Sequence, residues 1–265
     1  MSAKENQNIQ HRIEATNKIA LITGGSRGLG RNIALSLARK GNDVVLTYRQ
    51  NKEEGETVVA EIEKLGRKAV ALRLDVGDLS QFDGFRDALA LALETNWKRK
   101  DFDFLINNAG VNRPSTIDQT TEEAFDELLN IHFKGVYFLT QKLLPLIADG
   151  GRIVNTSSGL ARFATPGYAA YASMKGAIEV FTRYLAKELG PRGIAANVIA
   201  PGAIETDFTS ESLGRSGVKD FIASQTALGR VGVPDDIGGV VAFLCSEEGR
   251  WVNAQRIEAS GGMFL

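Results

Sequence analysis

The chain has 265 residues, of which 43% are apolar and 24% are charged, and its net charge is −1. This composition is typical of a globular α/β protein, and the near-neutral charge gives no reason to expect a nucleic acid or a membrane as a partner. The single cysteine, Cys245, excludes an intrachain disulfide, and the two histidines, His11 and His132, are too few and too far apart in the sequence to indicate a metal site.

The N-terminal 17 residues are polar and lack the apolar core of a signal peptide. We expect residues 1–17 to form a flexible leader and residues 18–265 to form a single domain. No apolar run approaches the ~18 residues of a membrane-spanning helix. The default expectation is therefore a cytoplasmic protein.

A short apolar run, Lys18–Thr23, predicts a buried strand, and an amphipathic pattern over residues 29–40 predicts the helix that follows. The turn between them is rich in glycine, so its backbone can approach a bound group closely. Free N–H groups and the helix dipole favour an anion at such a helix start, and the unit is typical of dinucleotide binding. We expect the dinucleotide to contact Gly24, Ser26, Arg27, Gly28, Leu29 and Gly30.

The second predicted strand, Asp43–Tyr48, lacks at its end the acidic residue that would bind the adenosine ribose hydroxyls and repel a 2′-phosphate. Tyr48 and Arg49 stand there instead, and Arg27 in the glycine turn can reach the same place. Because arginine pairs well with phosphate, these residues favour NADP(H) over NAD(H). The alternative is that both arginines are solvated surface residues.

Predicted strands and helices alternate along the rest of the chain, which indicates a parallel sheet with right-handed crossovers. The expected strands are 69–74, 102–106, 151–156, 194–200 and 256–259, and the expected helices are 53–65, 79–97, 121–147, 167–189 and one that starts at 234.

Each motif lies at the C-terminal end of a predicted strand or just beyond it, and ligands bind at that edge of open parallel sheets. Asp75 and Val76 end the third strand, where we expect the adenine, and residues 107–110 and 201–202 end two others. Residues 203–233 are glycine-rich and irregular. They form either a lid over the substrate or a surface insertion.

Tyr171 and Lys175 are four residues apart and therefore share one face of the predicted helix 167–189. A tyrosine with an ordinary pKa of about 10 is a poor acid-base catalyst at neutral pH, but a neighbouring ammonium or a positively charged nicotinamide favours the phenolate. Ser158 lies thirteen residues upstream of Tyr171, and its hydroxyl can hold the same substrate oxygen. This group of residues suits proton exchange with an alcohol or a carbonyl while hydride moves.

Over about residues 18–262 the chain resembles the short-chain dehydrogenase/reductases. The resemblance rests on five motifs in a fixed order: Thr23-Gly24-x-x-x-Gly28-x-Gly30, Asn107-Asn108-Ala109-Gly110, Ser158, Tyr171-x-x-x-Lys175, and Pro201-Gly202 followed by Ile204 and Thr206.

The resemblance implies a Rossmann fold, with a doubly wound seven-stranded parallel sheet and helices on both faces. It implies that Tyr171 is the general acid-base, that Ser158 orients the substrate oxygen, and that Lys175 lowers the pKa of Tyr171 and holds the nicotinamide ribose. It also implies a homotetramer joined through helices 122–147 and 167–189. The remaining cofactor contacts it implies are Asn108, Ala109, Gly110, Pro201, Gly202, Ile204 and Thr206.

His132 stands where the family has a catalytic asparagine that holds a water in a proton relay. An imidazole can also hydrogen-bond that water, although it is bulkier and titratable. Two interpretations stay open: His132 replaces the relay asparagine, or it is a histidine that only packs within its helix.

The family reduces carrier-protein thioesters, sugars, steroids and small ketones. Carrier-protein reductases hold their acidic partner with two basic residues, of which one aligns with Arg192 and the other with Asp149. An acid in that place disfavours a carrier protein, so we expect NADPH-dependent reduction of a free small-molecule carbonyl. The alternatives are a 3-oxoacyl-carrier-protein reductase and a regulatory protein that senses NADPH without turnover.

Arg49→Asp is expected to shift the cofactor preference from NADP(H) toward NAD(H). An aspartate there would repel the 2′-phosphate and accept hydrogen bonds from the ribose hydroxyls. The measurement is kcat/KM with each cofactor before and after the change. An unchanged ratio would mean that Arg49 is a solvated bystander.

Overall fold

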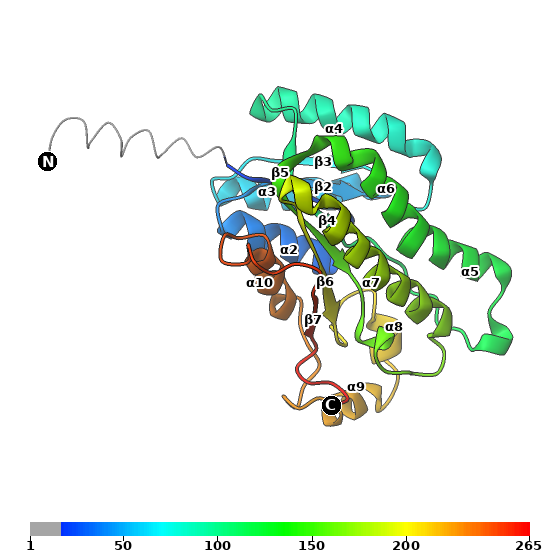
Figure 1. The fold of residues 1–265 in the computed structure, drawn as a ribbon. Coiled ribbons are helices and arrows are strands. Elements are labelled where there is room, and N and C mark those ends of the chain that lie inside the picture. Colours follow the sequence, from blue (N-terminus) through cyan, green and yellow to red (C-terminus); the bar gives the residue numbers. More distant parts are fainter. Residues whose placement is uncertain (1–16) are drawn as a thin grey trace, which may run out of the picture.

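The computed structural model describes residues 17–265, so the predicted leader lies outside the described residues except for Asn17. Seven strands form one sheet in the order β3-β2-β1-β4-β5-β6-β7, and every neighbouring pair is parallel. This arrangement confirms the predicted doubly wound sheet (Figure 1). The strands are β1 (Ile19–Ile22), β2 (Asp43–Tyr48), β3 (Ala69–Arg73), β4 (Phe102–Asn107), β5 (Ile147–Thr156), β6 (Ala195–Pro201) and β7 (Arg256–Ala259).

Helices cover both faces of the sheet, because the strands of a parallel sheet are apolar on both sides and each side needs an apolar layer against it. On one face the core is shared with α2 (Gly28–Arg39), α3 (Lys52–Lys64) and α10 (Asp235–Leu244). On the other face it is shared with α4 (Phe82–Trp97), α6 (Gly135–Leu143) and α7 (Ala169–Leu189). Within residues 17–265, no helix combines the length and the apolar character needed to cross a membrane.

The helix predicted over 121–147 runs without a break from Glu122 to Leu143, but one turn in its middle is not α-helical. Thr121 caps α5 (Glu122–Leu129) by accepting from the Ala124 amide, but a π-helix follows over Asn130–Lys134 before α6 begins. Directly after that wider turn, at the start of α6, Gly135 lies against the carbonyl oxygen of Val76, where an added Cβ would be 2.0 Å from the oxygen. The contact with Val76 comes from another part of the chain, so no local sequence pattern reports it.

The end of the same segment also differs from the prediction. Residues 144–146 form a short 3₁₀ turn that contains Pro145, and β5 starts at Ile147 rather than at 151. Proline lacks the amide hydrogen that a continuing helix needs. Residues 148–151 include two glycines and pair irregularly with β4, so the strand pattern is weak there.

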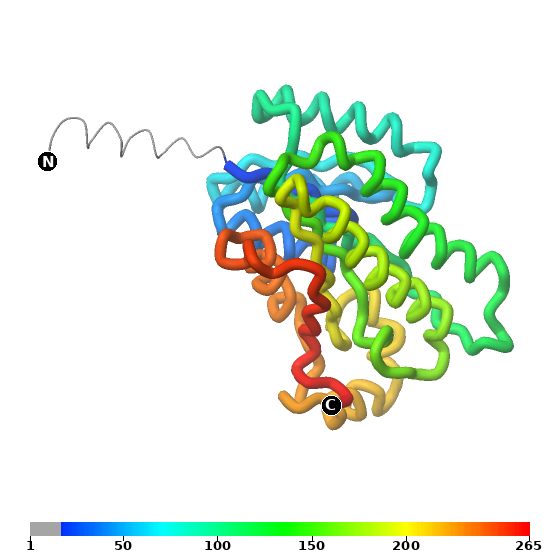
Figure 2. The backbone as a smooth tube through the Cα atoms, viewed as in Figure 1, coloured from blue at the N-terminus to red at the C-terminus, as the bar shows by residue number. Residues whose placement is uncertain are grey.

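The segment predicted to be irregular, 203–233, contains two short helices, α8 (Ser210–Leu213) and α9 (Val218–Ser224). Just after α9, Thr226 pairs with Met263 in an isolated antiparallel bridge. The C-terminal residues therefore run beside this segment, as Figure 2 shows.

A buried polar network fixes α6 and α7 to the central strands. The Asn107 amide donates to the Thr140 hydroxyl at 3.1 Å and to Asn155 at 2.8 Å. The Asn155 amide donates to the Thr182 hydroxyl at 2.9 Å. All four side chains are buried, so each of these donors needs its partner. The network holds α7 in place over β5.

Thr182→Val is expected to lower the free energy of unfolding by about 1–3 kcal/mol, because it leaves the buried Asn155 amide without an acceptor while keeping the volume. Thr182→Ser keeps the hydroxyl and serves as the matched control. Urea unfolding of the three proteins measures the difference. A valine variant no less stable than the serine variant would show that the network contributes nothing.

Candidate active site

The predicted site residues meet at one edge of the sheet. Gly24 follows β1, Asn108 follows β4, Ser158 follows β5, and Pro201 ends β6. Parallel strands bring all of their C-terminal ends to the same edge, which explains why motifs so far apart in sequence converge.

The turns after β1 and β4 are locked together. The Thr23 hydroxyl accepts from the amides of Asn108 and Ala109, at 3.0 and 3.1 Å. The Asn108 side chain donates back to the carbonyls of Thr23 and Gly24. An added Cβ on Gly30 would lie 2.0 Å from the Gly24 oxygen, so only glycine fits at this crossing.

The start of α2 suits a pyrophosphate. Arg27 is the N-cap residue and forms no side-chain capping bond, and the first turn holds no acidic residue. Gly28 has φ +55°, a left-handed conformation that exposes the turn's amides at little cost. The helix start therefore has free donors and a favourable dipole for an anion. The residues present fit a dinucleotide.

Two arginines lie where the adenosine end of the dinucleotide is expected. Arg49 is exposed just after β2 and forms no ion pair with the described residues. Arg27 lies 3.5 Å from Asp207, but both side chains are mostly exposed, and such pairs are worth little. Both guanidiniums are therefore accessible to a phosphate. Nearby, Asp75 accepts from the Gly77 amide at 2.9 Å and orders the turn expected to face the adenine.

Tyr171 and Lys175 project from the first turns of α7. Their side chains are buried, and the Lys175 amine lies 5.5 Å from the centre of the Tyr171 ring. The amine donates to the Thr156 carbonyl at 2.7 Å, which joins α7 to the end of β5. Ser158 lies two residues further on, and its hydroxyl oxygen accepts from the Leu160 amide at 3.2 Å.

Burial governs the ionisation of both residues. It raises the pKa of Tyr171, and a hydrogen bond with Ser158 opposes the rise. Burial also lowers the pKa of Lys175 to about 7. We expected Lys175 to lower the pKa of Tyr171. In the protein without cofactor, burial outweighs that effect, and the pKa of Tyr171 is raised. Tyr171 is protonated at neutral pH, the form that can donate to a carbonyl oxygen.

His132 lies in the π-helix with only 1% of its surface exposed. Its Nε2 is 2.8 Å from the carbonyl oxygen of Val111 and 3.2 Å from the Val111 amide, so this nitrogen is bound to the loop after β4. Its ring meets the Tyr171 ring edge-on, with centroids 5.0 Å apart. Nδ1 is buried and has no partner among the described residues. Among the described residues, His132 and Lys175 share no direct hydrogen bond.

Burial, and then the charge of Lys175, lowers the pKa of His132 to about 3. The imidazole is therefore neutral at every pH where the protein would work. A neutral ring has one donor and one acceptor nitrogen. Because Nε2 lies closer to the Val111 oxygen than to its amide, we assign the proton to Nε2.

Aromatic side chains near Tyr171 were not identified from the sequence. Phe208, in the predicted lid, has its ring centroid 6.1 Å from that of Tyr171 and is 39% exposed. Tyr168 packs with Leu128 and Met174 around the same tyrosine. No motif marks these aromatic residues. The only sequence signal for a place near the site was that Phe208 lies in the segment predicted as a possible lid.

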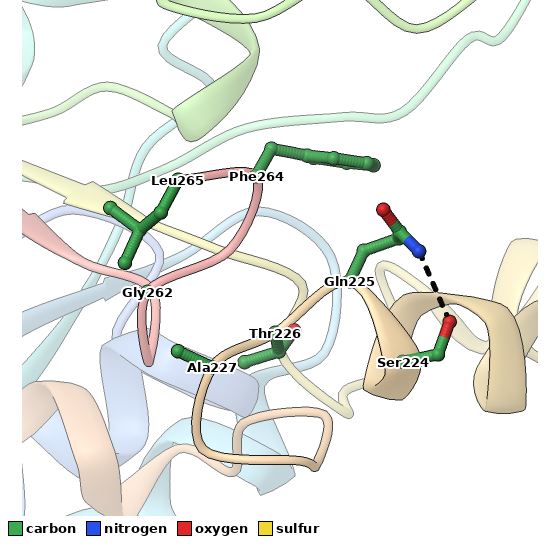
Figure 3. Close-up of a pocket in the computed structure, with 7 residues that line it drawn as sticks. All are labelled: Ser224, Gln225, Thr226, Ala227, Gly262, Phe264 and Leu265. Carbon is green, nitrogen blue, oxygen red and sulfur yellow. Dashed lines mark hydrogen bonds between the residues drawn. The ribbon is translucent and has the colours of Figure 1, made fainter.

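A cavity of about 450 Å³ lies between the end of α9 and the C-terminus. It is lined by Ser224, Gln225, Thr226, Ala227, Gly262, Phe264 and Leu265, which Figure 3 shows coming from these two segments. No predicted catalytic residue lines it. One of its lining residues, Phe264, has its ring in contact with that of Phe163, which lies in the loop after Ser158. In the part of the chain from residue 17 onward, no three His, Cys, Asp or Glu side chains cluster as a metal site would require.

Comparisons with known proteins agree with this geometry. The family model described as "Enoyl-(Acyl carrier protein) reductase" matches residues 24–264. A tetrahydroxynaphthalene reductase of Pestalotiopsis fici is 38% identical, over 96% of this chain and 93% of that protein. A 3-oxoacyl-[acyl-carrier-protein] reductase of Staphylococcus aureus is 36% identical, over 94% of this chain and 98% of that protein.

A solved structure of an angucycline C-6 ketoreductase with bound NADP superimposes with a TM-score of 0.89. It is 36% identical to this chain, and the match covers 93% of this chain and 95% of that one. These findings confirm the predicted fold, reaction class and cofactor. The chain belongs to the short-chain dehydrogenase/reductase family and is an NADP(H)-dependent oxidoreductase that reduces a ketone to an alcohol.

Proposed function

We propose that the chain reduces a ketone fused to an aromatic ring system, and that Tyr171 gives the proton. The observation that carries the substrate class is the aromatic lining beside Tyr171, with Phe208 part-exposed and Tyr168 packed next to it. Aromatic faces stack well on flat aromatic substrates. The named activities of two relatives, tetrahydroxynaphthalene reduction and angucycline ketoreduction, support the same class.

In this proposal Ser158 and Tyr171 both face the carbonyl oxygen, and the bound cofactor supplies hydride to the carbonyl carbon. The phenol of Tyr171 donates its proton as the oxygen gains charge, and one ketone thus takes up one hydride and one proton. Ser158 holds the same oxygen and orients it. Lys175, fixed by its bond to Thr156, would hold the nicotinamide ribose in this proposal.

A carrier-protein substrate is less well supported. Arg192 donates to the Asp149 carboxylate at 2.7 Å, to the carbonyl of Leu144 at 2.9 Å, and to the carbonyl of Ile147. Its guanidinium is thus occupied within the chain, and the adjacent acid would repel an acidic partner. A sensor that binds NADPH without turnover is disfavoured because Ser158, Tyr171 and Lys175 are all in place.

We assign His132 a positioning role. Its Nε2 ties the π-helix to Val111, and its ring fills the space beside Gly110, where an added Cβ would lie 2.7 Å from Cε1. The unpartnered Nδ1 is an acceptor that suits an internal water. Such a water would serve the relay that the family's asparagine serves, with the imidazole neutral throughout.

The homotetramer and the cytoplasmic location also stay proposals. Support for the tetramer comes from apolar side chains that remain exposed on α5, α6 and α7, since such patches mark protein interfaces. They are Phe125, Tyr137, Phe138, Val180 and Tyr184. The near-neutral charge and the single buried cysteine agree with a cytoplasmic protein.

Tyr171→Phe is expected to lower turnover at least a hundredfold, because general acid catalysis is worth about 10²–10⁴-fold, while NADPH binding stays nearly unchanged. The assay follows NADPH oxidation with 1-tetralone as the aromatic ketone, and with cyclohexanone and a 3-oxoacyl thioester as comparisons. Retention of more than about a tenth of the activity would refute the assignment of Tyr171. Faster turnover of the thioester than of 1-tetralone would refute the substrate class.

His132→Asn is expected to keep much of the activity, whereas His132→Leu should lower kcat strongly, since leucine fills similar space without a hydrogen bond. The parent's kcat should show no ionisation near pH 6.5, because burial keeps His132 neutral. Between about pH 6.5 and pH 3 the unfolded chain binds a proton at His132 that the folded chain does not. The parent should therefore lose stability relative to His132→Asn as the pH falls through that range. A folded leucine variant with normal kcat would leave His132 only a packing role.

A further inference from the structure

The face of α7 that carries Tyr171 and Lys175 continues one turn further to Glu179, which is again four residues on. Glu179 accepts from the Ser157 hydroxyl at 2.7 Å and from Arg256 Nε at 2.7 Å. Glu179 therefore connects the catalytic helix to the residue that precedes Ser158. Neither Glu179 nor Arg256 belongs to a family motif found in the sequence.

Each of the three guanidinium nitrogens of Arg256, on β7, donates a hydrogen bond. Besides its bond to Glu179, it donates to the carbonyl oxygen of Ser158 at 3.1 Å and to Glu258 at 2.7 Å. Its side chain is 24% exposed and that of Glu179 is 16% exposed. A planar fork with several donors fits acceptors in three directions, and partial burial makes such a charge-assisted set stronger than a surface pair.

A second arginine completes the frame. Arg162, four residues after Ser158, binds Glu258 through two nitrogens at 2.8 Å each. These bonds, foremost among the causes, hold the pKa of Glu258 well below its usual range, so this carboxylate stays charged. Two carboxylates, Glu179 and Glu258, thus bind Arg256 through different nitrogens. The segment after β5 is therefore held at two points. Arg256 binds the carbonyl of Ser158, and Glu179 binds the hydroxyl of Ser157.

We propose that Arg256 is a positioning residue that sets the Ser158 hydroxyl relative to Tyr171. Ser158 comes from the end of β5 and Tyr171 from α7, and the two must meet on one substrate oxygen. Arg256 contacts the first segment directly and the second through Glu179. The inference rests on the proposed roles of Ser158 and Tyr171. Displacement of a catalytic group by about 1 Å can cost on the order of 100-fold in rate.

Arg256→Lys tests the proposal, because it keeps the charge and loses the fork. The expected result is a fall in kcat for 1-tetralone of about 10- to 100-fold, with the dissociation constant for NADPH unchanged. The matched control is Arg192→Lys. Arg192 also binds one carboxylate and backbone carbonyls, but at the opposite end of α7, so its loss should leave kcat at the parent value.

The pH profile separates positioning from general loss of structure. Burial raises the pKa of Tyr171 and Ser158 opposes that rise, so a displaced Ser158 should raise the pKa further. In the reverse reaction, oxidation of 1-tetralol by NADP, activity requires the ionised phenol. The rising limb of the profile should therefore move to higher pH in Arg256→Lys and stay in place in Arg192→Lys.

Glu179→Gln is the second variant. It keeps an acceptor for Ser157 but removes the ion pair with Arg256, so it should show the same changes in kcat and pH profile to a smaller extent. If Arg256→Lys fails to fold, Glu179→Gln decides. Parental kcat and pH profile in the folded test variant, or equal losses in the test variant and Arg192→Lys, would overturn the inference. If the inference is overturned while Tyr171→Phe is inactive in the same assay, only the role of Arg256 is refuted. An active Tyr171→Phe would instead mean that the proposed function has failed.

Discussion

The site depends on one part-buried hydrogen bond, from the buried Lys175 amine to the carbonyl of Thr156. This bond crosses from α7 to the end of β5, so it sets where the helix that carries Tyr171 stands over the sheet edge. A buried amine has a strong need for such an acceptor, because desolvation penalises its charge. The polar network of Asn107, Asn155 and Thr182 beneath it supports the same alignment from within the core.

The same burial explains why the site suits reduction. It keeps Tyr171 protonated and brings the pKa of Lys175 to about 7. In the proposed reaction the protonated phenol donates to a carbonyl oxygen, and a lysine that titrates near neutrality would return a proton to it. His132 adds no charge here. Its Nε2 contacts the Val111 carbonyl, and its ring lies edge-on to that of Tyr171.

The sheet and the glycine turn could be predicted from the sequence because their causes are local. Apolar runs such as Ile19–Ile22 and the turn from Gly24 to Gly30 carry their own signals, and strand ends in a parallel sheet must share an edge. No sequence pattern predicted the π-helix, and Gly135, which follows it, packs against the carbonyl of Val76 from another segment. The pairing of Glu179 with Arg256 spans 77 residues and follows no spacing rule. The roles predicted for Ser158, Tyr171 and His132 stay predictions.

Burial raises the pKa of Tyr171, so the phenol stays in its acid form in the protein without cofactor. Ultraviolet difference titration of the cofactor-free protein against Tyr171→Phe isolates the ionisation of this one phenol. The account predicts no tyrosinate signal from Tyr171 at pH values where exposed tyrosines, with a pKa of about 10, have begun to ionise. A tyrosinate signal from Tyr171 below that pH range would contradict it.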